Sequence, residues 1–155
     1  MLHFAYGANM SRAVMRKHAP GAQPIGVATL ANYRFIITAD GYASVEPMRA
    51  AAVHGVLWRL TPRDRAALDA WESVAGGSYR AATLAVHGAG RRQMALVYLA
   101  RPRGIGRAKS GYVELVVAAA QAWELPPHYV ASLQQWLPVN PLGSGVRKLG
   151  EFGWT

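Results

Sequence analysis

The sequence contains no cysteine and few acidic residues. Among its 155 residues, 8 are Asp or Glu and 17 are Lys or Arg, which gives a formal net charge of +9 at pH 7. The absence of cysteine excludes disulfide frameworks, thiolate metal sites, iron–sulfur clusters and thiol nucleophiles. A chain of this length is expected to form one domain. Its 52% of hydrophobic residues and 16% of charged residues argue against disorder.

Long hydrophobic runs are also missing. The apolar run at residues 2–6 stops at Gly7 and has no basic segment before it, so it does not resemble a secretory signal. The most apolar later run, residues 112–123, carries Glu114 and is too short to span a bilayer. We therefore expect a soluble protein that has no membrane partner, and its lack of cysteine is compatible with a cytoplasmic location.

The excess of basic residues raises the question of a nucleic-acid partner, because a basic surface attracts phosphate whatever its sequence. The candidate residues are Arg91, Arg92 and the basic stretch at 101–109. They fall largely in expected turns, without interleaved aromatic residues or a recognised binding motif. We do not expect nucleic acid to be the partner, and a basic module that binds RNA or another anion stays as the alternative.

The pattern of apolar residues and turns predicts strands first and helices mostly last. Strands are predicted at residues 2–6, at 25–38 as two strands joined near 31–32, and at 42–45, 53–60, 79–87 and 94–100. Helices are predicted at 11–17, 61–72, 110–123 and 128–137, followed by an irregular tail at 138–155. This order is typical of an α+β fold and not of alternating βα units.

Glu72 is the acidic residue whose position suggests chemistry. Thr61, Pro62 and Asp64 form a strong helix start, and the helix should run to about Glu72. At 100° per residue, Glu72 lies only about 40° around the helix from Leu68 on the buried stripe. Burial and the helix dipole both favour the protonated carboxyl, so its pKa should be raised toward the range of a general base. A glutamate that turns toward water at the helix end is the alternative.

The other acidic residues have simpler explanations. Asp64 serves the helix cap, and Asp69 sits on the flank of the same helix. Glu114, Glu124 and Glu151 lie in helical or tail contexts that favour solvent.

A second candidate feature is the turn at residues 6–9, between a strand and a helix capped by Ser11. A glycine turn that leads into a helix presents backbone N–H groups suited to a carboxylate or phosphate. An ordinary strand–turn–helix connection explains the same residues.

Metal and cofactor motifs are not found. The five histidines are scattered without ligand spacing, and no H-E-x-x-H motif occurs. The sequence has no G-x-S-x-G elbow, and Gly104–Gly106 lacks the strand and helix that a dinucleotide fingerprint needs. We expect neither a metal nor a cofactor.

Taken together, four segments resemble the γ-glutamylcyclotransferase-like (AIG2-like) family. The first is residues 4–10, FAYGANM, which are similar to the family's F-x-Y-G-S-N-hydrophobic signature. The second is residues 53–58, similar to the strand before the family's catalytic helix. The others are L-D-x-x-E at 68–72 with G-x-Y at 77–79, and the closing L-P-x-x-Y-x-x-x-L at 125–133. The resemblance covers nearly the whole chain up to residue 137.

The resemblance implies a small mixed β-barrel with flanking helices, formed by a single domain at residues 1–137. It also implies an intramolecular reaction, in which the α-amine of a γ-glutamyl group attacks its own side-chain amide and releases 5-oxoproline and an amine. Glu72 matches the family's catalytic glutamate, which acts as both base and acid. The substrate-binding positions implied are Tyr6, Gly7, Ala8, Asn9, Met10, Tyr79 and Tyr112.

Two residues depart from the family pattern, and several functions stay open. Ala8 stands where serine is usual, and Ser73 follows Glu72 where glycine is common. The departing amine could be an amino acid, a polyamine, a lysine side chain or an antibiotic-like amine. Transfer or hydrolysis of another amide by the same glutamate is a further alternative.

Overall fold

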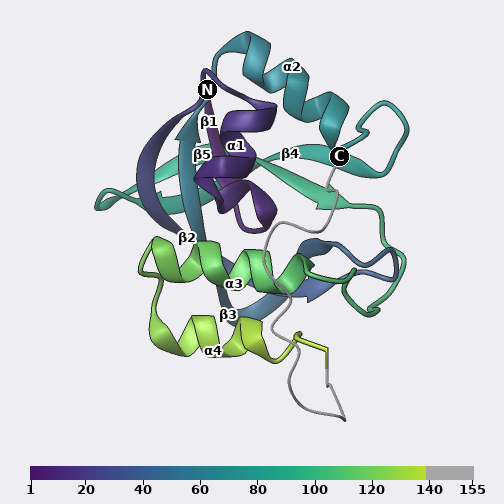
Figure 1. Cartoon of the computed structure of the whole chain (residues 1–155). Helices are drawn as coiled ribbons and strands as arrows, with labels where there is room; N and C mark the ends of the chain where they lie inside the picture. The colour runs from purple at the N-terminus through teal and green to yellow at the C-terminus, as the bar shows by residue number, and fades with distance from the viewer. Residues whose placement is uncertain (139–155) are drawn as a thin grey trace.

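The computed structural model describes residues 1–138 and shows a closed five-stranded barrel with helices packed outside it (Figure 1). The strands are β1 (Leu2–Ala5), β2 (Gln23–Ile37), β3 (Ala43–Arg59), β4 (Tyr79–Gly88) and β5 (Arg91–Ala100). The helices are the 3₁₀ turn η1 (Ala8–Met10), then α1 (Arg12–His18), α2 (Pro62–Trp71), α3 (Tyr112–Ala122) and α4 (Pro127–Gln134). The expected α+β class and the mixed barrel are confirmed. The tail expected at 138–155 lies outside the described residues from 139 onward.

Barrel closure depends on contacts between segments far apart in the sequence. The strand order is β1-β3-β2-β4-β5, and the ring closes where β1 runs parallel to β5, with His3 opposite Leu96. The other pairs are antiparallel. Gly55 of β3 permits a close approach to β1, because a Cβ there would lie 2.2 Å from the carbonyl oxygen of Ala5.

Two strand predictions were wrong in the same way. The expected break near residues 31–32 is a β-bulge within one continuous β2, and the strands expected at 42–45 and 53–60 are parts of one long β3. Asn32 and Ala50 have positive φ angles of 63° and 67°, and the Ala50 N–H donates to Asn32 Oδ1 at 3.1 Å. The bulge absorbs extra residues and bends the hairpin without ending it.

The helix signals were more reliable. The capping box of Thr61 and Asp64 is present at the start of α2, and the Ser11 side chain accepts from the Val14 N–H at the start of α1. The third helix begins at Tyr112, after Gly111 in the left-handed conformation, and not at Ser110.

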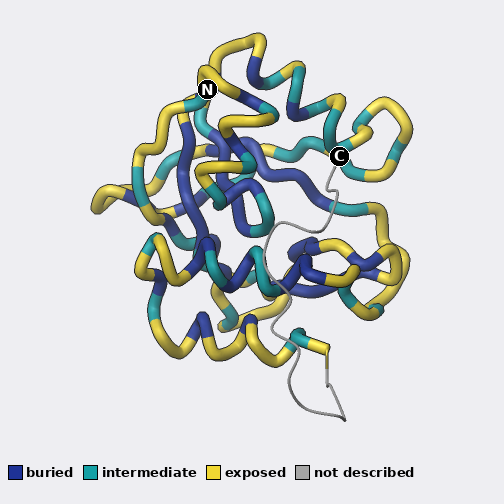
Figure 2. The backbone as a smooth tube through the Cα atoms, viewed as in Figure 1, coloured by how far each residue is buried: buried dark blue, intermediate teal, exposed yellow. Residues whose placement is uncertain are grey.

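Buried residues follow the barrel strands and the inner faces of the helices (Figure 2). Both faces of the segment at residues 53–60 are buried, since the adjacent Val56 and Leu57 point to opposite faces and are both buried. Glu114 departs from expectation, because its Oε2 atom is buried and not in solvent. Among residues 1–138, no helix is long and apolar enough to cross a membrane.

Candidate active site

A cavity of about 860 Å³ opens where the loop after β1 meets the end of α2. Seven of the eight predicted site residues line it: Tyr6, Gly7, Ala8, Asn9, Glu72, Tyr79 and Tyr112. Met10 does not line the cavity, because its side chain is fully buried and its carbonyl oxygen accepts from Trp123 Nε1 at 2.7 Å. The fold therefore brings together residues 6–9, 72, 79 and 112, which are distant in sequence.

The loop after β1 is shaped by Gly7. The carbonyl oxygen of Gly7 accepts from the Met10 N–H at 3.0 Å, which closes η1, and Ser11 then caps α1. A Cβ on Gly7 would lie 2.8 Å from the hydroxyl oxygen of Tyr112. Glycine thus lets this phenol from the start of α3 reach the loop.

The end of α2 places Glu72 in the cavity. Trp71 is the last helical residue, and the Glu72 N–H still donates to the Leu68 carbonyl at 2.8 Å. Ser73 then adopts a φ of 50°, in the left-handed region that favours glycine. This conformation explains physically why glycine suits the position after the glutamate.

Asn9 and Glu72 are joined by a side-chain hydrogen bond. Asn9 Nδ2 donates to Glu72 Oε1 at 3.3 Å, although the two residues are 63 positions apart. The side chain of Asn9 is only 7% exposed, and its Oδ1 atom is buried without a hydrogen-bond partner among residues 1–138. A buried unpaired acceptor beside a carboxyl is costly unless a ligand satisfies it.

Burial raises the pKa of the Glu72 carboxyl from 4.5 to about 7, while the hydrogen bond from Asn9 opposes the rise. Desolvation disfavours the charged carboxylate, and a donor to that carboxylate favours it. A carboxyl with a pKa near 7 can both take and give a proton at neutral pH.

Two tyrosines of the cavity, Tyr79 and Tyr112, keep their protons. Burial raises the pKa of Tyr79 and Tyr112 above the usual range of a phenol, and the nearby Glu72 charge adds to the effect. The Tyr79 hydroxyl donates to the Ala43 carbonyl at 2.8 Å, and the Ala43 N–H donates to the Tyr112 hydroxyl at 3.4 Å. Both phenols are thus held by β3 as neutral groups at the cavity surface.

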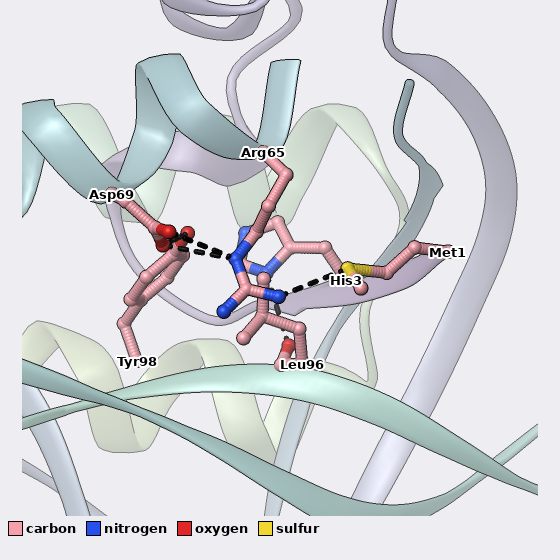
Figure 3. Close-up of polar contacts among 6 residues, drawn as sticks. All are labelled: Met1, His3, Arg65, Asp69, Leu96 and Tyr98. Atoms are coloured by element: carbon pink, nitrogen blue, oxygen red, sulfur yellow. Dashed lines mark hydrogen bonds and ion pairs between the residues drawn. The ribbon is translucent and has the colours of Figure 1, made fainter. Parts of the chain in front are cut away.

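A polar network under α2 supports the site (Figure 3). The Tyr98 hydroxyl of β5 donates to Asp69 Oδ1 at 2.7 Å, and Arg65 Nε donates to both oxygens of Asp69 at 3.0 and 3.1 Å. The carbonyl of Tyr98 also accepts the hydroxyl of Tyr6. Tyr98 therefore ties both the β1 loop and α2 to β5, one turn before Glu72.

His3 lies in the same network. Its Nδ1 atom lies 3.0 Å from the Leu96 carbonyl, which can only accept, so Nδ1 carries the proton (Figure 3). Burial lowers the pKa of His3 to about 4, so the ring is neutral at pH 7.

Sequence reasoning missed several residues that line the cavity, among them His3, Lys17, His18, Trp71 and Tyr98. Among them only Trp71 lies within a recognised motif, at an unspecified position of L-D-x-x-E. The others reach the cavity through barrel closure and the packing of α1, which local patterns do not encode.

No group of three His, Asp or Glu side chains within residues 1–138 is arranged to hold a metal ion. A second hollow of about 630 Å³ lies elsewhere, over β2 and the β4–β5 turn. None of the predicted site residues lines it.

The fold and the site define a small barrel domain with a half-buried glutamate in its cavity, and the comparison with protein families agrees. The model of the AIG2-like family matches residues 52–133, which include β3, α2 and the Glu72 segment. The chain belongs to the AIG2-like family. No curated protein matches the sequence significantly.

Solved structures extend the likeness to nearly the whole chain. A protein described as a gamma-glutamyl cyclotransferase superposes with a TM-score of 0.84 at 22% identity, over 93% of this chain and 92% of that one. An uncharacterized protein from Homo sapiens gives a TM-score of 0.83 at 23% identity, covering 92% and 91%. YkqA from Bacillus subtilis gives 0.77 at 26% identity, over 87% of this chain and 53% of that one. This chain therefore has the γ-glutamylcyclotransferase fold.

Proposed function

We propose that the protein is a γ-glutamyl cyclotransferase, which converts a small γ-glutamyl compound into 5-oxoproline and a free amine. Glu72 acts as the general base and then as the general acid. The observation that carries the proposal is the buried carboxyl of Glu72, with a pKa of about 7, beside the loop at residues 6–9.

In the proposed reaction, the α-nitrogen of the γ-glutamyl group attacks its own side-chain carbonyl carbon. The new carbon–nitrogen bond closes a five-membered ring, and the bond from that carbon to the departing nitrogen breaks. The attacking ammonium loses two protons and the departing nitrogen gains two, so Glu72 carries them across and returns to its starting state. The nucleophile and the carbonyl belong to one molecule, which supplies the proximity that the reaction needs.

Asn9 is suited to hold the attacking nitrogen next to its base. Its Nδ2 atom donates to Glu72, while its buried Oδ1 atom lacks a partner among the described residues. An ammonium N–H of the substrate would satisfy this acceptor. The nucleophile would then lie within reach of the carboxylate that deprotonates it.

The other predicted residues, except Met10, surround the space for the γ-glutamyl group. The backbone of Gly7 and Ala8 lies at the cavity surface, so the replacement of the usual serine by Ala8 removes a hydroxyl and leaves the backbone N–H groups. The phenols of Tyr79 and Tyr112 stay neutral and add polar groups to the cavity surface, where the Tyr79 hydroxyl already donates to the Ala43 carbonyl.

The rival function, a basic module that binds RNA, requires one basic patch. Arg91 begins β5 and Arg101 follows its end, so the two groups of arginines lie at opposite ends of a ten-residue strand. At about 3.3 Å per residue, they are roughly 30 Å apart. This separation favours the small-molecule substrate, and the cytoplasmic location stays a prediction.

The identity of the product tests the proposal. The wild-type protein is incubated with γ-glutamyl amino acids, γ-glutamylputrescine and ε-(γ-glutamyl)lysine, and the products are separated by chromatography. We expect 5-oxoproline from at least one compound. Release of free glutamate would instead indicate hydrolysis, and no product together with salt-dependent RNA binding would support the rival function.

A further inference from the structure

The cavity has room for more than the γ-glutamyl group. Pockets for drug-sized ligands measure about 300–1,000 Å³, and this one measures about 860 Å³. The amine half of the substrate must therefore lie against residues that the proposed reaction does not use.

An aromatic pair forms one wall of this remaining space. The rings of His18, at the end of α1, and Trp71, at the end of α2, are stacked with centroids 3.8 Å apart and an interplanar angle of 27°. Both residues line the cavity, and so do the apolar Ala13 and Val14 of α1. Trp71 directly precedes Glu72, and both residues line the same cavity.

The stacked pair carries no charge at neutral pH. Burial lowers the pKa of His18, and the positive charge of Lys17 lowers it further. A neutral imidazole on an indole presents a flat aromatic surface, on which an aromatic ring packs better than an aliphatic chain.

The charges around the cavity disfavour a cationic amine half at this wall. Lys17 lines the cavity next to His18 on α1. The other exposed charges at the cavity are Asp40 and Arg103, which pair with each other at 3.6 Å. A carboxylate near the wall is attracted by Lys17, whereas a second ammonium is repelled.

We infer that the departing amine is an aromatic α-amino acid, whose ring packs on His18 and Trp71 and whose carboxylate faces Lys17. This inference rests on the proposed cyclotransferase function and narrows its substrate class. Trp71 and His18 are specificity-determining residues in this reaction, and Lys17 selects amino acids over simple amines.

A set of matched substrates tests the inference. We expect kcat/KM for γ-glutamylphenylalanine to exceed that for γ-glutamylalanine by about tenfold, because of ring contact. It should exceed that for γ-glutamylphenethylamine, which lacks the carboxylate, and that for γ-glutamylputrescine, which is cationic. Faster release of 5-oxoproline from the alanine or putrescine compound would overturn the inference and leave the cyclotransferase function standing. No 5-oxoproline from any compound would overturn both.

Variants assign the preference to the wall. Trp71→Leu and His18→Leu should each lower the phenylalanine-to-alanine ratio of kcat/KM several-fold, mainly through KM. Trp136→Leu is the matched control, since Trp136 contacts Phe35 and does not line the cavity. Lys17→Met should reduce the difference in kcat/KM between γ-glutamylphenylalanine and γ-glutamylphenethylamine. If the ratio stays at the wild-type value in both wall variants, the assignment is wrong.

Discussion

Glu72 derives its properties from two local conditions, the desolvation of its carboxyl group in a half-buried residue and a single side-chain donor. Burial raises its pKa and the Asn9 hydrogen bond partly offsets the rise. The sequence predicted the direction of this shift from the helix stripe. It did not predict the donor, because Asn9 meets Glu72 only when β1 and α2 pack together in the barrel.

The pH dependence of turnover should report this carboxyl. Because the base form is deprotonated, kcat should rise with pH through an apparent pKa of about 7. In Asn9→Ala, the rise of kcat should occur at higher pH, since the donor that stabilises the carboxylate is lost. The measurement is a pH–rate profile of both proteins. A wild-type kcat that rises near pH 4.5, or an apparent pKa that is unchanged in Asn9→Ala, would contradict the role of Glu72 as the base.

Ser73 should be a site of backbone strain. Its φ of 50° is unfavourable for a residue with a Cβ, so Ser73→Gly should stabilise the fold by about 0.5–1 kcal/mol. Ser110→Gly is the matched control, because Ser110 does not have a positive φ. This substitution should lower the free energy of unfolding, since glycine gives the unfolded chain more conformational freedom. Urea unfolding of the three proteins measures both effects, and equal losses in the two variants would contradict the strain.

At the scale of elements, local signals predicted helix starts and failed at strand ends. The capping box at Thr61 and the Ser11 cap depend on neighbouring residues, so the sequence predicts them well. The strands β2 and β3 continue past the bulge at Asn32, because the partner strand supplies hydrogen bonds there. A turn-like residue in such a bulge resembles a strand end in sequence.

The contact between α2 and β5 should matter for both stability and turnover. Tyr98→Phe removes the hydroxyl that donates to Asp69 at 2.7 Å, and should lower the free energy of unfolding by about 1 kcal/mol. It should also lower kcat more than it changes KM, because Glu72 loses support one turn away. Tyr33→Phe is the control, since no hydrogen bond of its hydroxyl occurs among the described residues. Wild-type kcat in Tyr98→Phe would limit the network to a structural role.

At the scale of the molecule, the charged form of Glu72 weakens the fold. Its folded pKa of about 7 exceeds the reference value of 4.5, so the stability that this group contributes is complete below pH 4.5 and is lost as pH rises through 7. Glu72→Gln removes this dependence. Relative to wild type, the variant should therefore gain about 2 kcal/mol between pH 5 and pH 8. Urea unfolding of both proteins at both pH values measures this difference. The same change in the free energy of unfolding for wild type and variant would contradict a desolvated carboxyl with a raised pKa.

Some features of the whole molecule could be predicted from the sequence, and others arise only when the chain folds. The α+β class followed from the order of elements, and the barrel followed from the family resemblance. The charge of +9 is a property of composition, whereas the separation of Arg91 from Arg101 by the length of β5 is a property of the fold. The cavity itself combines η1, α1, α2 and α3 around the barrel, so no local pattern could outline it.

The most direct test is the release of 5-oxoproline by Glu72→Gln at pH 8, with the best γ-glutamyl substrate of the wild type. Glu124→Gln is the matched control, because Glu124 is exposed and does not line the cavity. We expect Glu72→Gln to keep its fold, by circular dichroism, and to lose at least about 100-fold in kcat, while Glu124→Gln retains wild-type turnover. Wild-type turnover by a folded Glu72→Gln protein would contradict the assignment of Glu72 as the catalytic base.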